Sequence, residues 1–346
     1  MQHVAIDLGG RESQLCARAI DGSIVKEARV STKSLPKLLQ AMEPSRVILE
    51  TSAEAFRIAD AALAHGHEVR VVPATLVKQL GVGARGVKND RKDAQTLSEV
   101  SCRIDLPSVH VPSQLARELK SVCGSREILV KIRTTLINNV RGWARTQLIR
   151  IRTGSTPTFQ QRVREYVQTN QLSLPELSLP EHIERQLVML DALKVQVKAA
   201  DQQLVKLASE HPVCRRLMTT PGVGPVTAVR FVAALDDVTR FRNAHAVQSY
   251  LGLVPGENSS SERKQHTGIT KAGSTEVRRT LIQAAWAAFR KAPKEPMVGW
   301  ATQIAARRGV FIAIVALARK LAGILFAMWR DGTTYRPSQN AEVARA

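Results

Sequence analysis

The sequence predicts an α/β domain followed by two all-helical regions. Residues 1–107 alternate short runs rich in β-branched side chains with helical runs, which is typical of an α/β fold. Residues 113–210 keep a helical hydrophobic spacing, and residues 211–330 form a second helical region. The last residues, 331–346, have little apolar content, so we expect a flexible tail.

The elements of the first domain follow from its apolar runs. Five runs are strand-like, at residues 3–9, 12–20, 23–30, 46–50 and 67–72. Asp21 and Gly22 form a hairpin signal between the second and third strands. Helices are expected at residues 35–42, 53–64, 74–80 and 90–103. The order β-β-β-α-β-α-β-α-α is that of an RNase-H-like domain, and other α/β folds share part of it.

Four acids of this domain are candidates for a metal site. Asp7 lies in an apolar strand, where an acid is costly to bury unless it is paired or binds a cation. Glu50 closes the fourth strand, and Asp90 and Asp93 share one face of the last helix. In the expected topology the first and fourth strands are neighbours and this helix crosses them, so the four carboxylates would converge. Oxygen ligands at this density suit Mg²⁺ or Mn²⁺.

Each acid also has a plainer interpretation. Asp7 is compatible with a strand end, Glu50 with a cap of the next helix, and Asp90 with the N-cap of its own helix. Glu54, one helical turn after Glu50, is the acid most easily mistaken for a member of the site. The four acids together favour a metal site, where two ions about 4 Å apart could activate an attacking oxygen and stabilise a leaving one.

The charge balance indicates a nucleic-acid partner. Lysine and arginine outnumber aspartate and glutamate 50 to 30, which gives a net charge of +20 and an isoelectric point near 10.5. Such an excess is expected of a protein that neutralises many phosphates, more than of a merely solvated surface. Residues 113–165 are especially basic, with 11 lysines and arginines against 3 acids.

The second helical segment of the middle region, residues 180–210, has a hydrophobic seam. Its members follow spacings of three and four residues and are Leu190, Leu193, Val197, Ala200, Leu204 and Leu207. This pattern suits a helical hairpin or a dimeric coiled coil, and the spacing leaves both open.

Two segments of the C-terminal region are candidates for DNA contacts. Gly222 and Gly224 lie in a tight turn before a helix, like a helix-hairpin-helix, and such a turn can offer backbone N–H groups to a phosphate. A simple turn between helices is equally compatible. The polar loop 255–273 holds three serines, one of which could attack a phosphodiester while cations stabilise the developing charge. The nearby cations are Arg263, Lys264, Lys271, Arg278 and Arg279.

The cysteines and apolar runs suggest a cytoplasmic protein. Cys16, Cys102, Cys123 and Cys214 are scattered without zinc-site spacing, and we expect small apolar side chains in a reducing compartment. We expect no signal peptide, because no basic segment leads into an apolar run at the N-terminus. The apolar stretch 309–318 is too short to span a bilayer, so we expect no membrane partner.

These motifs together resemble the DEDD transposases of insertion-sequence family 110. The resemblance covers nearly the whole chain, from VAIDLG and VILETS through KNDRKDA to PGVGPVTA, YLGLVP and GITKAG. It implies a RuvC-like first domain and a C-terminal transposase domain. Between them, the hydrophobic seam predicts a long helical middle region of coiled-coil type. The family's four acids fall on Asp7, Glu50, Asp90 and Asp93.

The resemblance also implies a serine nucleophile and two kinds of nucleic acid. Counting from the flanking motifs places the nucleophile at Ser260, and Ser259 and Ser261 stay possible because Ser261 replaces the usual glycine. Members are thought to act as homo-oligomers on DNA ends, through a covalent phosphoserine, guided by a structured noncoding RNA. We therefore expect a nucleoid-associated recombinase with RNA on its basic helices. The expected RNA contacts are Arg126, Lys131, Arg133 and Arg141.

Two other functions compete with a recombinase. A metal-dependent junction endonuclease would use water as its nucleophile and keep the serine loop only for binding DNA. A non-catalytic nucleic-acid-binding protein, such as a decayed copy, would need no metal. The intact set of four acids argues against the decayed copy.

Overall fold

The computed structural model describes residues 1–79, 90–170, 178–257 and 266–337. The chain divides into two compact units, Met1–Pro112 and Ser113–Ala346. The expected division of the second unit near residue 210, and the other finer domain limits, stay predictions. The charge is divided unequally between the units. The first unit holds 15 basic and 13 acidic residues, which leaves 35 and 17 in the second, so the net charges are +2 and +18.

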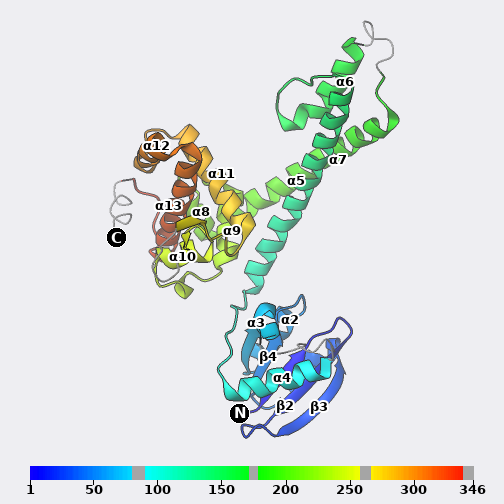
Figure 1. The fold of residues 1–346 in the computed structure, drawn as a ribbon, viewed down its shortest axis with the longest axis vertical. Helices are drawn as coiled ribbons and strands as arrows, with labels where there is room; N and C mark the ends of the chain where they lie inside the picture. The colour runs from blue at the N-terminus through cyan, green and yellow to red at the C-terminus, as the bar shows by residue number, and fades with distance from the viewer. Residues whose placement is uncertain (80–89, 171–177, 258–265, 338–346) are drawn as a thin grey trace. The chain divides into compact units, whose positions relative to one another are not determined.

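The first unit is built on a mixed five-stranded sheet of order β3-β2-β1-β4-β5 (Figure 1). The strands are β1 (His3–Asp7), β2 (Glu12–Arg18), β3 (Ile24–Ser31), β4 (Arg46–Glu50) and β5 (Glu68–Val72). β2 is antiparallel to both β1 and β3, whereas β4 runs parallel to β1 and to β5. The helices are α1 (Leu35–Gln40), α2 (Ala55–Ala64), α3 (Ala74–Gln79) and α4 (Asp90–Arg103). The expected neighbours β1 and β4 are confirmed.

Both faces of this sheet are covered. Side chains of a strand alternate between faces, so Val4 and Ile6 pack with the helices α1 and α2, whereas Ala5 faces the other way. Ala5 and Ile48 pack with Leu97 of α4. The mixed α/β character of the first unit is confirmed. Its closer assignment as a RuvC-like domain stays an expectation.

The second unit is mostly helical. Its helices are α5 (Gln114–Thr146), α6 (Phe159–Asn170), α7 (Glu181–Glu210), α8 (Pro212–Leu217), α9 (Pro225–Leu235), α10 (Ala244–Tyr250), α11 (Thr275–Lys291), α12 (Pro296–Arg308) and α13 (Val310–Arg330). The long helices α5 and α7 pack on each other as a hairpin, and α6 packs beside its tip. The predicted polar loop contains a short two-stranded sheet, β6 (Pro255–Glu257) and β7 (His266–Ile269), which the sequence analysis did not expect.

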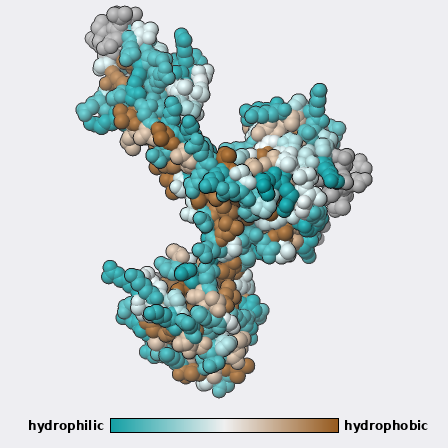
Figure 2. Space-filling model, turned by 180° about the vertical axis from the view of Figure 1, so that it is seen from behind, coloured by the Kyte–Doolittle hydropathy of each residue, from teal (hydrophilic) through white to brown (hydrophobic). Residues whose placement is uncertain are grey.

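The predicted seam of α7 is used inside the chain. Leu190 packs in a small core at the hairpin tip with Ile137 of α5, whereas Leu204 packs in the large core of the helices α8–α13. The spacing left open a helical hairpin and a dimeric coiled coil. The seam residues pack within the chain, as in the hairpin. Other apolar side chains stay exposed along the hairpin, among them Val188 and Val195, and Figure 2 shows patches of hydrophobic residues there.

Helix α13 corrects the expectation for the late apolar stretch. The stretch is not about ten residues long but part of a 21-residue helix, which by length and composition could cross a membrane. From Ala313 onward most of its apolar residues, such as Leu321 and Phe326, are buried in the large core of the second unit, whereas Val310, Phe311 and Ile312 of the first turn are exposed. Burial within the protein accounts for the apolar composition of this later part of the helix.

Candidate metal centre and nucleic-acid contacts

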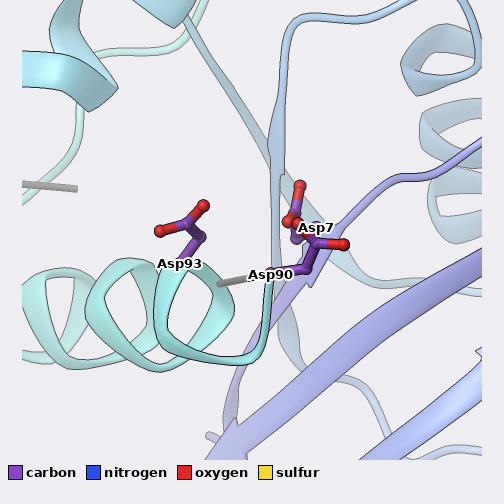
Figure 3. Close-up of side chains that lie close together, drawn as sticks. All are labelled: Asp7, Asp90 and Asp93. Atoms are coloured by element: carbon purple, nitrogen blue, oxygen red, sulfur yellow. The ribbon is translucent and has the colours of Figure 1, made fainter. Parts of the chain in front are cut away.

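Three of the four predicted acids come together in the first unit. Asp7 ends β1, and Asp90 and Asp93 lie in the first turn of α4. One carboxylate oxygen of each lies within 4.8 Å of the others, and Figure 3 shows the three side chains. Asp7 and Asp93 are partly buried and Asp90 is exposed. Like charges at this spacing repel one another, and a helix N-terminus offsets only part of that repulsion. A divalent cation would offset it more fully.

The register of α4 on β1 explains why these acids meet. His3 Nδ1 and Ser101 Oγ, at the other ends of the two elements, are 2.8 Å apart in a buried hydrogen bond. From Ser101 back to Asp93, α4 rises about 12 Å at 1.5 Å per residue. From His3 to Asp7, the strand covers about 13 Å at 3.3 Å per residue. The two paths match, so the first turn of α4 lies over Asp7.

A hydrogen-bond network fixes the turn that follows Asp7. Thr32 Oγ1 donates to the Gly9 carbonyl over 2.6 Å, and its other partner is the buried Ser13 hydroxyl at 2.7 Å. A Cβ on Gly9 would lie 2.3 Å from the Glu12 carbonyl oxygen, so this turn requires glycine. This network was not predicted from the sequence. Gly9 at the end of the apolar run 3–9 was the available signal.

A second set of polar contacts holds the first half of α4 over the sheet. Glu27 of β3 accepts hydrogen bonds from Arg91, with 3.1 Å to Nε, and from Gln95. These donors, Arg91 first, lower the pKa of Glu27 below its ordinary value. One turn further on, Arg18 of β2 donates to Ser98 over 3.0 Å. These bonds keep Asp90 and Asp93 on the side of Asp7.

Glu50 does not join the three aspartates. It ends β4, beside the strand of Asp7, and alternation along β4 places it on the same face as Ile48, which α4 covers. Its oxygens do not lie within 4.8 Å of all three aspartate oxygens. The expected fourth carboxylate is therefore adjacent in topology but outside the group, and its role stays a prediction.

The three aspartates fit a hard divalent cation. They supply only oxygen donors, from two elements held in fixed register, and Mg²⁺ usually takes one or two carboxylates with phosphate and water oxygens. The first unit also holds Cys16 and Cys102 as free thiols, and neither is among the grouped ligand atoms. This donor set favours Mg²⁺ or Mn²⁺ over a thiophilic metal.

The four cations expected to bind RNA lie in different surroundings. Arg126 is ion-paired with Asp201 of α7, so it helps to join the two helices of the hairpin. Lys131 is exposed. Arg133 and Arg141 both line a cavity of about 140 Å³ at the hairpin tip. Arg126 therefore contacts the other helix of the hairpin, whereas Arg133 and Arg141 line a cavity.

The glycine turn is shaped by packing. Gly222 has φ of +84°, and a Cβ there would lie 2.3 Å from the Ala284 carbonyl oxygen of α11. Glycine is therefore required for the turn and for its close contact with α11. Gly224 is the N-cap of α9 and has open space around it. A phosphate contact at this turn stays a prediction, and α9 offers it one donor fewer because Pro225 lacks an N–H.

The serine-bearing part of the polar loop, residues 258–265, lies outside the described residues. This applies to Ser259, Ser260 and Ser261 and to Arg263 and Lys264. The flanking strands β6 and β7 are antiparallel, and their register pairs Pro255 with Ile269.

The other cations near the loop differ from one another. Lys271 is exposed, with φ of +56°. Arg278 is 7% exposed and donates to the carbonyls of Leu251, Ala272 and Gly273, so it braces the loop. Its expected phosphate contact stays a prediction. Arg279 is half-exposed and ion-paired with Glu127 of α5 over 2.8 Å.

Comparison with known proteins finds the same family at both ends of the chain. A family model described as "Transposase", of the DEDD IS110 type, matches residues 4–146, and one described as "Transposase IS116/IS110/IS902 family" matches residues 214–297. Together they cover more than half of the chain.

Several curated proteins are similar over nearly their full length. The transposase for insertion sequence element IS1111A of Coxiella burnetii is 26% identical over 96% of this chain and 91% of its own. A probable family 20 transposase of Pseudomonas aeruginosa is 26% identical over 97% and 99%. The transposase for IS1328 of Yersinia enterocolitica is 24% identical over 96% and 98%.

Proposed function

Since the chain belongs to the IS116/IS110/IS902 family of transposases, which cut and rejoin DNA, we propose that it moves an insertion sequence with a divalent metal held by Asp7, Asp90 and Asp93. The convergence of these three carboxylates from β1 and α4 is the observation that carries this proposal. Glu50 is the proposed fourth ligand, since it ends the neighbouring strand on the same face of the sheet.

The protein's own residues supply position and charge. When bound, Mg²⁺ or Mn²⁺ supplies a Lewis acid for phosphodiester oxygens. The sheet and α4 hold the carboxylates in place through His3, Ser101 and Glu27, so little reorganisation is needed as charge develops. The partly buried Asp7 and Asp93 sit where a DNA phosphate can approach from the exposed side of Asp90.

The proposed nucleophile is Ser260. Its Oγ would bond to phosphorus while the DNA oxygen leaves with the serine proton, and a hydroxyl of the second strand would reverse the step and restore the serine. Support comes from the family and from the sequence spacing of the loop. The structure adds that Arg278 and the strands β6 and β7 brace the ends of this loop.

We further propose that a structured RNA guides the enzyme and that it works as a homo-oligomer. The charge of +18 on the second unit supports binding to a polyanion. The seam of α7 is buried within the chain, so a second copy would contact other apolar residues of the hairpin. Val188 and Val195 are exposed and available for such a contact.

A covalent-trap experiment tests the serine chemistry. The protein is mixed with labelled DNA of its element ends, the flanking RNA and Mg²⁺, then denatured. We expect label on the protein, dependent on metal and lost in Ser260→Ala, with Ser259→Ala as the matched control. Cutting without any adduct would instead favour a junction endonuclease that uses water, and would reduce the serine loop to a binding element.

A further inference from the structure

Three adjoining cavities form a basic groove at the tip of the α5–α7 hairpin. Their volumes are about 250, 520 and 140 Å³, the first and third share Arg133, and the second and third share Arg141. We call this the tip groove and define it by its cations. They are Arg133, Arg141, Arg145, Arg162, Lys194 and Lys198.

The acids around the tip groove are already neutralised. Asp201, which lines the first cavity, is paired with Arg126. Glu184 and Asp191 are both paired with Arg164, which does not line the groove. Within the described ranges no ion pair involves any of the six groove cations, so their charge is left for a ligand.

Two of the groove arginines stack on a buried ring, and two have a buried N–H without an acceptor. The guanidinium carbons of Arg141 and Arg162 lie 5.4 and 6.0 Å from the ring centroid of the buried Phe159. Stacking of this kind fixes the planar group before a ligand arrives. Arg133 and Arg162 each keep a buried Nε without an acceptor among the described residues, which costs free energy unless a ligand supplies one.

The length of the groove points to an extended anion. Arg133, Arg141 and Arg145 are spread along α5 over about 18 Å, at 1.5 Å per residue, and line the adjoining cavities in turn. Phosphates of one nucleic-acid strand advance about 3.4 Å each along a duplex axis, so this row can meet several of them. Lys194 and Lys198 of α7 face the same cavity as Arg133.

We propose that the tip groove binds the phosphodiester backbone of a nucleic acid, at a site separate from the metal centre and the serine loop. The inference rests on the proposed function only in that the chain binds nucleic acid. Thr134, Asn138 and Thr156 line the same cavity and add neutral donors and acceptors, which suit sugar and base edges.

The proposal is tested by measuring nucleic-acid binding under conditions in which no DNA or RNA is cut. The full chain, kept in EDTA so that no strand is cut, is titrated with a labelled RNA stem–loop and with a DNA stem–loop of the same sequence, over a range of salt. The double variant Lys194→Gln/Lys198→Gln changes two exposed side chains, and Arg133→Gln/Arg141→Gln changes two groove arginines. Arg185→Gln, an exposed arginine of α7 paired with Glu181 outside the groove, is the control.

Each double variant is expected to weaken binding at every sequence and to lower the slope of log K against log salt by about 2, while Arg185→Gln leaves it unchanged. A loss in the RNA arm only identifies RNA as the occupant, and a loss in the DNA arm only identifies DNA. If the double variants bind both RNA and DNA with an unchanged slope, the proposed site in the tip groove is wrong, but nucleic-acid binding by the chain is not. Absence of binding by the unaltered chain overturns the nucleic-acid function as well.

Discussion

Asp93 is the less exposed of the two α4 aspartates at the proposed metal centre. It is partly buried, and its ligand oxygen lies within 4.8 Å of those of Asp7 and Asp90. Asp93→Asn removes one negative charge but keeps the shape, so we expect Mn²⁺ affinity to fall about 10-fold or more, the loss typical of a disturbed metal shell. Calorimetric titration with Mn²⁺ checks this.

The matched control is Glu99→Gln on the same helix. Glu99 is paired with Arg103 and lies outside the acidic group. Equal Mn²⁺ affinity for Asp93→Asn and the unaltered chain would mean that the three aspartates do not share an ion.

His3 gives the first unit a pH dependence. Burial, followed by the nearby Arg46 charge, lowers the pKa of His3 from its ordinary 6.5. Just below pH 6.5 the unfolded chain therefore binds more protons than the folded unit. The contribution of His3 to the stability of the unit is fully present above pH 6.5 and is lost as the pH falls below that value. We expect the β1 amides to exchange faster on acidification, after correction for intrinsic rates.

His3→Gln is the test of cause, because glutamine can still bond Ser101 but does not titrate in this range. It should flatten the acid-induced change in β1. The local readout matters because burial also lowers the pKa of His211, which belongs to the second unit. The same acid response in His3→Gln would exclude His3 as its source.

At the scale of an element, α4 depends on Glu27 for its placement. Glu27 bonds Arg91 and Gln95, one residue after Asp90 and two after Asp93. Glu27→Gln should loosen the first turn of α4 and lower Mn²⁺ affinity several-fold, although Glu27 is not a ligand. Faster amide exchange in the first turn of α4 should accompany the loss. Weaker binding with unchanged exchange would point to a long-range charge effect instead.

The seam of α7 stabilises the second unit by apolar burial. Leu204 is fully buried in the large core, and Leu204→Ala should cost about 2–5 kcal/mol of unfolding free energy. The next residue, Val205, is 52% exposed, and Val205→Ala should change stability by less than about 0.5 kcal/mol. Urea unfolding can be followed by tryptophan fluorescence, because all four tryptophans lie in the second unit.

The elements could be predicted where a local pattern decides them. The apolar run 3–9, the acid pair on α4 and the heptad spacing of α7 are local patterns, and a strand at His3–Asp7 and helices formed there. Contacts between distant residues carry no such signal. The bond of Thr32 to Gly9 and the ion pair of Arg126 with Asp201 join positions that only the folded chain brings together.

In the candidate site, too, local patterns could be predicted and contacts between distant residues could not. The sequence predicted which acids converge, and three of them do, because strand alternation and the register of α4 follow from general geometry. It could not separate Arg278, which is buried against carbonyls, from exposed cations, because the charge of a side chain does not report its burial. Glu50 lies on the expected strand and face. The position of its carboxylate depends on the packing around the side chain, which the spacing of residues in the sequence does not give.

For the whole molecule, the uneven charge predicts how it meets nucleic acid. Because nearly all of the excess lies on the second unit, binding should be strongly salt-dependent and should survive loss of the acidic centre. With about 6–10 phosphates neutralised, affinity should fall about 10³- to 10⁵-fold between roughly 50 and 200 mM salt. A titration of binding against salt measures this, and a flat response would contradict it.

The most direct test of the account is the metal dependence of DNA cutting by Asp7→Asn. Asp7 comes from the sheet and not from α4, so this change leaves the helix intact while it opens the acidic group. If the aspartates hold the metal, cutting of element-end DNA in Mg²⁺ or Mn²⁺ falls by at least about 100-fold, or roughly 2.7 kcal/mol, whereas DNA affinity is unchanged. Cutting at the unaltered rate, with the same metal requirement, would contradict the assignment of the centre.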